Sequence, residues 1–358
     1  MRRASATLRI TISWWLVVTA AAQDQSAATR HNEALRQVRL LELPQQRNAA
    51  TARILAMGRH ATSAINATLT DPRPEVICRL ALIIRALGNE AEGTAIILKK
   101  VAASENPKLA YAARWALSTF EPTGITLLSD RTNDRILEVD RTGKEVWHLG
   151  GLAGVFDARR LPSGNYLVAL SEAGAVQELT RHGKVVWSHE TKQQPQSATR
   201  LPNGNTLIAT PEGNITVAEV TAKGTTVWQY GPGWAWSAQR LTDGTTLVPS
   251  AMKKEIRLID HRGKTLRTYP CPLGVIGLKA TERNTFLICP HGRRLIQEMD
   301  HSGRVLADYG IDGKPHSAHR VPTGGIAVAG EDFAALYDAN GKANWVLKAG
   351  CYGSAMHY

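Results

Sequence analysis

The feature that most constrains this chain is a sequence repeat that starts near Gly124 and runs to the last residue. A glycine follows a short apolar segment in six related phrases such as DRTGKEVW and RHGKVVW, with successive spacings of 40, 41, 39, 40 and 38 residues. These glycines are Gly143, Gly183, Gly224, Gly263, Gly303 and Gly341. A second turn recurs every 40 residues, at Gly164, Gly204, Gly244 and Gly324, with Asn284 in the remaining place. A period of this length predicts a repeat architecture.

Each period contains short strand-like segments separated by turn residues. Phrases such as RLPNGNTLIA place Asn-Gly or a related pair between two apolar segments. Tight hairpin turns need a positive φ, which glycine adopts at low cost. Four short antiparallel strands in about 40 residues are typical of one β-propeller blade. We therefore predict a mainly β fold over residues 124–358.

The two ends of the repeat predict how the ring closes. The first period begins with ITLLSD and lacks the leading strand that has the sequence pattern SAxRL in other periods. The chain ends in Ser354-Ala355-Met356-His357-Tyr358, which matches that missing strand. A C-terminal strand that completes the first blade leaves no free sheet edge. The prediction is six four-stranded antiparallel blades.

Two further residue types recur at fixed positions in the blades. We expect the tryptophans near the blade ends, Trp147, Trp187, Trp228 and Trp345, to pack between neighbouring blades. Arginines recur at Arg160, Arg200, Arg240 and Arg320, but the corresponding positions hold Ala280 and His357. The four guanidinium groups could ring the channel and bind an anion. Alternatively, each arginine ties one blade to the next, which is the interpretation we favour.

The repeat RLPNGNTLIA…DxxGKVVW resembles the six-bladed arylsulfotransferase-like propellers and, more broadly, the quinoprotein-like (pyrroloquinoline-quinone-type) propellers. The quinone-binding members imply eight blades, a vicinal cysteine pair and acidic calcium ligands. Cys78, Cys271, Cys289 and Cys351 include no adjacent pair. We therefore expect no bound pyrroloquinoline quinone, no other cofactor and no metal site.

The resemblance to arylsulfotransferases implies a channel histidine that is transiently sulfated, assisted by further histidine and arginine residues. The phrase PHSAHR supplies His316, His319 and Arg320, of which His316 and Arg320 are the candidate catalytic residues. The positions equivalent to His316 hold Phe156, Gln196, Trp236, Ile276 and Gly353. A channel with several histidines is therefore not predicted.

The blade topology predicts one ligand-binding face of the disc. The loop that enters the innermost strand and the loop between the second and third strands share this face. The candidate ligand-binding residues there are Phe156, Gln196, Trp234 and Trp236, which lie with His316 near the axis, and Lys253, Lys254, His291, Arg293 and Arg294 on the rim. His319 is a further ligand-binding candidate. Exposed tryptophans beside cationic groups suit a sugar ring, an aromatic sulfate or an acidic polymer. Alternatively, the tryptophans plug the channel and the rim charges are only solvated.

The N-terminal third has a different pattern. Residues 1–23 carry Arg2, Arg3 and Arg9, then an uncharged run, then small residues, which is typical of a signal peptide. The apolar run is shorter than the ~20 residues that a spanning helix needs, so a retained membrane anchor is the weaker alternative. We predict an exported protein, periplasmic or extracellular, with no membrane-spanning segment after removal of the signal.

Residues 27–120 have helical periodicity, as in Val76, Ile77, Leu80, Ile83 and Ile84. The phrase DPRPEVICRLALIIRALG resembles the second helix of a HEAT-type repeat. A small helical bundle of no repeat class is the alternative. HEAT-like units imply a surface for a protein partner.

Two functions remain open. The first is a non-catalytic binding or scaffold protein, with the helices for protein contacts and the propeller mouth for an anionic, sugar or aromatic ligand. The second is an arylsulfotransferase-like enzyme. The formal net charge of +12 is compatible with anionic partners, but we expect no nucleic-acid partner.

Cys271 and Cys289 are a candidate disulfide pair.

Overall fold

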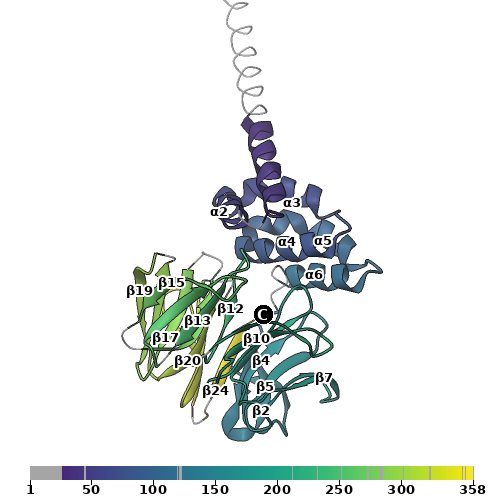
Figure 1. Ribbon diagram of the computed structural model, residues 1–358. Coiled ribbons are helices and arrows are strands. Elements are labelled where there is room, and N and C mark those ends of the chain that lie inside the picture. The colour runs from purple at the N-terminus through teal and green to yellow at the C-terminus, as the bar shows by residue number, and fades with distance from the viewer. Residues whose placement is uncertain are drawn as a thin grey trace, which may run out of the picture.

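The computed structural model describes residues 26–357 except 44–45, 119, 121–122, 212, 232, 251, 272–273, 282–284, 301, 322–323, 349 and 351. Helices occupy the N-terminal part and strands the remainder (Figure 1). The predicted signal peptide, residues 1–23, lies outside the described residues. So do Asn284, Cys351 and Tyr358.

The described strands form six four-stranded antiparallel sheets, which confirms the predicted propeller. The inner strands are β24 (Tyr352–His357), β4 (Val155–Arg160), β8 (Ser197–Arg200), β12 (Gln239–Arg240), β16 (Val275–Ala280) and β20 (Pro315–Arg320). The second strands are β1 (Thr126–Asp130), β5 (Tyr166–Leu170), β9 (Thr206–Ala209), β13 (Thr246–Ser250), β17 (Thr285–Pro290) and β21 (Ile326–Gly330). The third strands are β2 (Arg135–Val139), β6 (Ala175–Leu179), β10 (Val217–Val220), β14 (Glu255–Ile259), β18 (Leu295–Asp300) and β22 (Phe333–Tyr337). The outer strands are β3 (Glu145–Leu149), β7 (Val185–Glu190), β11 (Thr226–Tyr230), β15 (Thr265–Pro270), β19 (Val305–Gly310) and β23 (Ala343–Lys348).

The ring closes as predicted, because the last strand pairs with the first. β24 lies antiparallel to β1, with Thr126 opposite His357 and Leu128 opposite Ala355. The Ser354 hydroxyl accepts a hydrogen bond from the backbone N–H of Ala158 in the next blade at 3.0 Å. The C-terminal strand therefore completes one blade and also contacts its neighbour.

Arginine and glutamate side chains that recur at fixed positions of the repeat join adjacent blades. Arg200 and Arg240 donate to Glu178 and Glu219 of the preceding blade, each at 2.6 Å. Arg320 donates likewise to Glu298. At the boundary where the arginine is replaced by Ala280, the glutamate position holds Leu258, and both pack against the same apolar cluster. The arginines at these three boundaries therefore tie blades together, as we favoured.

Aromatic rings fill the same boundaries. Trp147 stacks on Tyr166 of the next blade with ring centroids 4.7 Å apart. Trp187 and Trp228 lie under the guanidinium groups of Arg200 and Arg240, at 4.5 and 4.8 Å. Trp345 is buried in a cluster that also contains residues of β24 and β1. The predicted packing of these tryptophans between blades is confirmed.

The N-terminal block is a set of short packed helices. A helix spans residues 26–40, followed by α2 (Arg47–Met57), α3 (Thr62–Thr68), α4 (Pro74–Leu87), α5 (Ala95–Ala102) and α6 (Pro107–Leu117). The 3₁₀ turns η1 (Gly58–Ala61) and η2 (Gly88–Thr94) separate α2 from α3 and α4 from α5. α5 starts at Ala95, directly after the last residue of η2.

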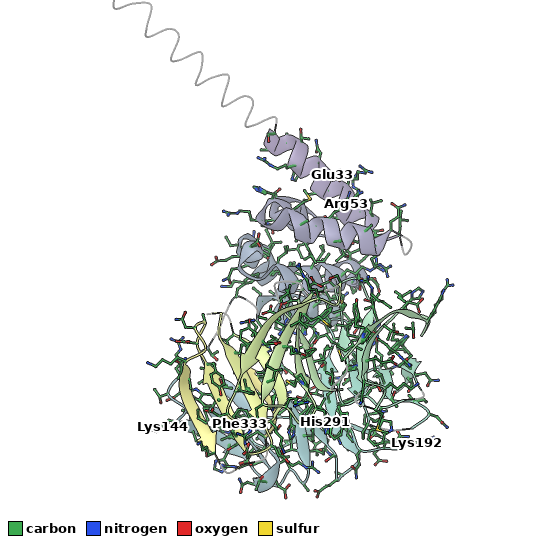
Figure 2. The ribbon with its side chains drawn as sticks, turned by 90° about the vertical axis from the view of Figure 1, so that its left-hand side faces the viewer. Glu33, Arg53, Lys144, Lys192, His291 and Phe333 are labelled. Atoms are coloured by element: carbon green, nitrogen blue, oxygen red, sulfur yellow. The ribbon has the colours of Figure 1, made fainter. Side chains whose placement is uncertain are left out.

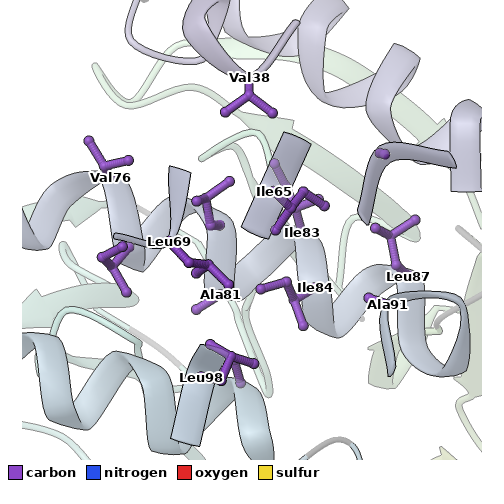
Figure 3. Close-up of a cluster of buried hydrophobic side chains, with 14 of the residues drawn as sticks. Val38, Ile65, Leu69, Val76, Ala81, Ile83, Ile84, Leu87, Ala91 and Leu98 are labelled. Carbon is purple, nitrogen blue, oxygen red and sulfur yellow. The ribbon is translucent and has the colours of Figure 1, made fainter. Parts of the chain in front are cut away.

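The apolar face of α4 forms the centre of the helical core. Ile83, Ile84 and Ala81 are buried against side chains of the neighbouring helices, such as Ile65 and Leu98 (Figure 3). Gly58 and Gly88 have the same backbone angles, φ 54° and ψ −132°, at equivalent corners of two helix–turn–helix units. This duplication is compatible with the HEAT resemblance, which stays a prediction.

The helical block covers one face of the propeller (Figures 1 and 2). The Trp115 indole of α6 donates to the backbone carbonyl of Arg200 at 3.2 Å, and the Cys78 thiol lies 3.4 Å from the carbonyl of Pro202. Both carbonyls belong to the end of β8 and the turn around Gly204. The helices therefore sit over the Asn-Gly-type turns, on the face opposite the predicted ligand mouth.

Candidate functional site

The inner strands of the six blades place side chains around the central axis. We define the mouth ring as Phe156, Gln196, Trp236, Ile276, His316 and Gly353, and the floor ring as Arg159, Thr199, Gln239, Lys279, His319 and Met356. All members of the mouth ring line a small void, and all members of the floor ring line a large one. Three residues of extended strand separate the two rings, which corresponds to about 10 Å.

The mouth ring is largely filled by its own side chains. The Phe156 ring lies 5.7 Å from that of Trp236 and 6.1 Å from that of His316, measured between centroids. The Arg131 guanidinium lies over the Phe156 ring at 5.7 Å. A void of about 60 Å³ remains in the channel, whereas small-molecule sites usually have about 300–1,000 Å³. Phe156, Trp236 and His316 thus lie together at the mouth, where their side chains plug the channel.

The two candidate catalytic residues are not brought together. His316 Nδ1 lies 3.3 Å from the backbone carbonyl of Tyr352, and burial lowers the pKa of the His316 imidazole. Arg320 follows four residues later on β20, about 13 Å along an extended strand. Its guanidinium contacts Glu298 and Tyr309 at the blade boundary. Strand geometry therefore assigns His316 to the mouth and Arg320 to a structural ion pair.

The remaining candidates are dispersed over the face away from the helices. Gln196 is buried, with 5% of its surface exposed, and Trp234 is half-buried outside the void. The rim residues Lys253, Lys254, His291, Arg293 and Arg294 are exposed. Figure 2 shows His291 on the half of the propeller away from the helices. His319, by contrast, belongs to the floor ring and faces the helices.

The large cavity lies between the helical block and the propeller. Its volume is about 930 Å³. Leu55 of α2, Leu82 of α4 and Trp115 of α6 contribute apolar surface from above, and the floor ring closes it from below. This volume is within the range of small-molecule sites. The cavity therefore offers room that the mouth does not.

The cavity is strongly cationic. Seven arginines and one lysine line it, and among the described lining residues Asp243 is the single carboxylate. Arg200, Arg240 and Arg320 have glutamate partners in adjacent blades. The other cationic lining residues are Arg85, Arg114, Arg159, Arg160 and Lys279. Asp157, below the floor ring, pairs with Arg159 at 3.0 Å. Four of the seven arginines therefore pair with carboxylates that lie outside the lining.

Lys279 lies near the positive charges of Arg159 and Arg85. Burial is the largest cause that lowers the pKa of its amine well below the ordinary value, and the positive charges of Arg159 and Arg85 lower it further. The carboxylate of Asp157 acts in the opposite direction. The amine is therefore less readily protonated than that of a surface lysine.

Sequence reasoning missed Lys279, Arg159, Arg85 and the cavity itself. The repeat does contain a signal for the floor ring, because the third residue after the position of Phe156 is polar in five of the six blades. Nothing in the repeat indicates that helices cover this ring. The helical residues Arg85 and Arg114 could be assigned to the cavity only through the tertiary contacts.

Three features give no site. Cys271 and Cys289 are free and pack in different clusters, so the candidate disulfide is wrong. Within the part of the chain that the structure describes, no group of three or more His, Cys, Asp or Glu side chains is placed to hold a metal ion. None of the described helices combines the length and apolarity needed to cross a bilayer.

Comparisons with known proteins show the fold. No protein-family model matches the chain, and no curated protein matches it. A solved structure of a Bacteroides caccae protein of unknown function is 19% identical, with TM-score 0.57 over 66% of this chain and 98% of that chain. A virginiamycin B lyase from Staphylococcus aureus is 14% identical, with TM-score 0.48 over 64% of this chain and 81% of that chain. A functionally unknown protein from Desulfotomaculum acetoxidans is 12% identical, with TM-score 0.47 over 66% and 80%. At such identities the similarity concerns the fold alone, and the arylsulfotransferase-like resemblance stays a prediction.

Proposed function

We propose that this protein is a non-catalytic binding protein that holds a small organic anion in the cavity between the helices and the propeller. The observation that carries the proposal is the composition of the lining, which holds seven arginines and, among the described residues, one carboxylate, Asp243. Four of these arginines pair with carboxylates outside the lining. Guanidinium groups bind carboxylate, sulfate and phosphate through paired hydrogen bonds. The apolar surface of Leu55, Leu82 and Trp115 would contact the rest of the ligand. The proposed ligand site is therefore on the face opposite the mouth, although the sequence led us to expect the ligand at the mouth.

The test compares charged and neutral ligands of one shape. Calorimetric titration with benzoate, phenyl phosphate and phenyl sulfate is expected to give binding that weakens with added salt, and benzyl alcohol is expected to bind at least tenfold more weakly. One charge-assisted hydrogen bond contributes about 1.5–3 kcal/mol, and 1.4 kcal/mol is a factor of ten in affinity. Equal binding of benzyl alcohol and benzoate would contradict the proposal.

A pair of matched variants locates the site. The double variant Arg85→Gln/Arg114→Gln removes two positive charges from the cavity wall, and we expect it to weaken benzoate binding at least tenfold. The double variant Arg293→Gln/Arg294→Gln removes the same charge from the mouth rim and is expected to leave binding unchanged. If the rim variant loses binding and the cavity variant keeps it, the ligand lies at the mouth. Thermal unfolding of both variants controls for folding.

An arylsulfotransferase-like reaction through His316 is the alternative from the sequence. The filled mouth and the separation of His316 from Arg320 give it no specific support. Incubation with an aryl sulfate donor and a phenol acceptor tests it directly. Turnover that His316→Ala abolishes would overturn the non-catalytic proposal.

The compartment and the partner are also proposals. The pattern of residues 1–23 supports export to the periplasm or the extracellular space, which cell fractionation would test. The helix of residues 26–40 lies at the end of the block farthest from the propeller (Figure 1). It is our proposed surface for a protein partner, because the opposite end of the block is occupied by the propeller.

A further inference from the structure

The floor of the cavity contains an amine without a committed acidic partner. Lys279 projects from β16 into both the channel and the large cavity. It makes no hydrogen bond or ion pair in the described part of the chain, although it feels the charge of Asp157. Lys279 is half-buried, and lysine side chains that leave the surface usually have a partner, so we looked for a ligand that this amine could bind.

Asp157 is already engaged by other groups. Its Oδ2 accepts from Nε and Nη2 of Arg159, at 3.1 and 3.0 Å, and from the backbone N–H of Ala198 at 3.1 Å. Two donors of a permanently charged guanidinium and one backbone donor thus converge on the same oxygen. Lys279 therefore lies beside an ion pair in which Arg159 is the hydrogen-bonded cation.

The charges around Lys279 favour the neutral amine. Arg159 on β4 and Arg85 on α4 repel the ammonium form, and burial acts in the same direction. Asp157 on β4 opposes them. Arg160, His319 and Asp243 also line the cavity. A neutral lysine amine has a free lone pair and is a nucleophile toward carbonyl carbon.

We propose that Lys279 forms an imine with an aldehyde or ketone that also carries a carboxylate or phosphate group, within the cavity between the helices and the propeller. This inference rests on the proposed function, because the arginines that would hold the anionic group are those of the same cavity. The amine nitrogen attacks the carbonyl carbon, and a proton passes from nitrogen to oxygen to give the carbinolamine. Loss of water then leaves the carbon–nitrogen double bond, and no oxidant or reductant takes part. Water reverses the reaction and releases the ligand.

No other amine competes at this site. Lys279 is the single lysine among the described lining residues of the cavity. An unperturbed lysine amine has a pKa of about 10.4 and is protonated near neutral pH. An imine at Lys279 should therefore form selectively near pH 7, where surface amines react slowly.

The experiment traps the imine with borohydride. The full chain is incubated near pH 7 with 4-carboxybenzaldehyde, reduced, and mapped by peptide mass spectrometry; benzaldehyde is the uncharged control. We expect one reduced adduct per chain, on Lys279, and its loss in Lys279→Met and Lys279→Arg. The control Lys253→Met should keep the adduct. Arg114→Gln should slow trapping of the carboxylated aldehyde at least tenfold and leave that of benzaldehyde nearly unchanged, because Arg114 lines the cavity but is not among the charges that lower the pKa of the Lys279 amine.

A second measurement separates this inference from the proposed function. Binding of 4-carboxybenzyl alcohol, which has the carboxylate but an alcohol in place of the aldehyde, is measured for the parent protein and for Lys279→Met. If both proteins bind it and the parent gives no adduct on Lys279, the imine is disproved and the anion site stands. If neither protein binds this alcohol, the proposed anion site is disproved as well. Adducts spread over exposed lysines would also overturn the inference.

Discussion

Nη2 of Arg200 on β8 donates to Oε2 of Glu178 on β6 at 2.6 Å, so a guanidinium of one blade binds a carboxylate of the blade before it. The two side chains are 6% and 16% exposed, which makes this a largely buried ion pair. The same guanidinium lies over the Trp187 ring. Breaking such a pair leaves the remaining charge in a poorly solvated position.

We expect Glu178→Ala to lower the free energy of unfolding by about 3–5 kcal/mol, because Arg200 stays buried without its partner. Equilibrium denaturation in urea measures the change. The double variant Glu178→Leu/Arg200→Ala reproduces the pair Leu258 and Ala280 that the protein uses at another boundary. It should cost no more than about 1–2 kcal/mol, since no charge is left buried without its partner, although the hydrogen bonds of Glu178 with Asn165 and of Arg200 with Thr206 are lost along with the cation–π contact. A double variant as unstable as Glu178→Ala would contradict this account.

Replacing Gly277 by serine should destabilise the protein, although serine is the commonest residue at this position of the repeat. A Cβ at Gly277 would lie 2.1 Å from the backbone carbonyl oxygen of His316. Because backbone must move to relieve such a contact, we expect a loss of about 1–3 kcal/mol. Gly310→Ser is the matched control, since nothing lies within 4 Å of its Cβ position. Equal thermal stabilities of the two variants would refute the prediction.

Loss of the Ser354 hydroxyl should weaken the closure of the ring. Ser354→Ala leaves the buried backbone N–H of Ala158 without its acceptor, at a cost of about 1–3 kcal/mol. Deletion of residues 352–358 should have a larger effect, because it exposes the edge of β1. Thermal unfolding and size-exclusion chromatography measure both changes. A truncated chain that melts like the full chain would show that β24 does not close the ring.

Burial of His316 should make stability depend on pH. Its pKa is lowered in the folded protein, so the unfolded chain takes up the proton first as the pH falls through about 6.5. Stability is therefore full above this pH and is lost below it, until the folded imidazole also becomes protonated. Glu331 opposes the shift, whereas Arg131 and His291 reinforce it. His316→Gln should reduce the slope of unfolding free energy against pH below about pH 6.5. Burial also lowers the pKa of His189, so part of this slope should remain in the variant.

Much of the propeller could be predicted from sequence because its determinants are local and repeated. A glycine with positive φ, such as Gly143 or Gly204, is needed at each tight turn whatever surrounds it. The arginine of one blade and the glutamate of the previous one recur with the same period, as Arg200 and Glu178 do. The missing strand at the start of the repeat and the extra strand at its end also predicted how the ring closes.

The mouth could be predicted only in part. Phe156, Trp236 and His316 belong to alternate blades, and no sequence pattern states that three rings from nonadjacent blades meet on one axis. Their combined volume fills the space that the sequence suggested for a ligand. The candidate residues His316 and Arg320 lie apart for a simpler reason. Four residues of extended strand reach from the mouth ring to a point beyond the floor ring.

By itself, the sequence determined the number of blades, their four-stranded form, the closing strand and the contacts at most blade boundaries, because each depends on residues at fixed short spacings. The tertiary structure decided which face is covered and where the large cavity lies. Trp115 on a helix and the carbonyl of Arg200 on a strand meet across 85 residues, and Lys279, Arg159 and Arg85 come together from a strand of one blade, a strand of another and a helix. Such contacts depend on how whole domains pack, for which a repeat in the sequence carries no signal.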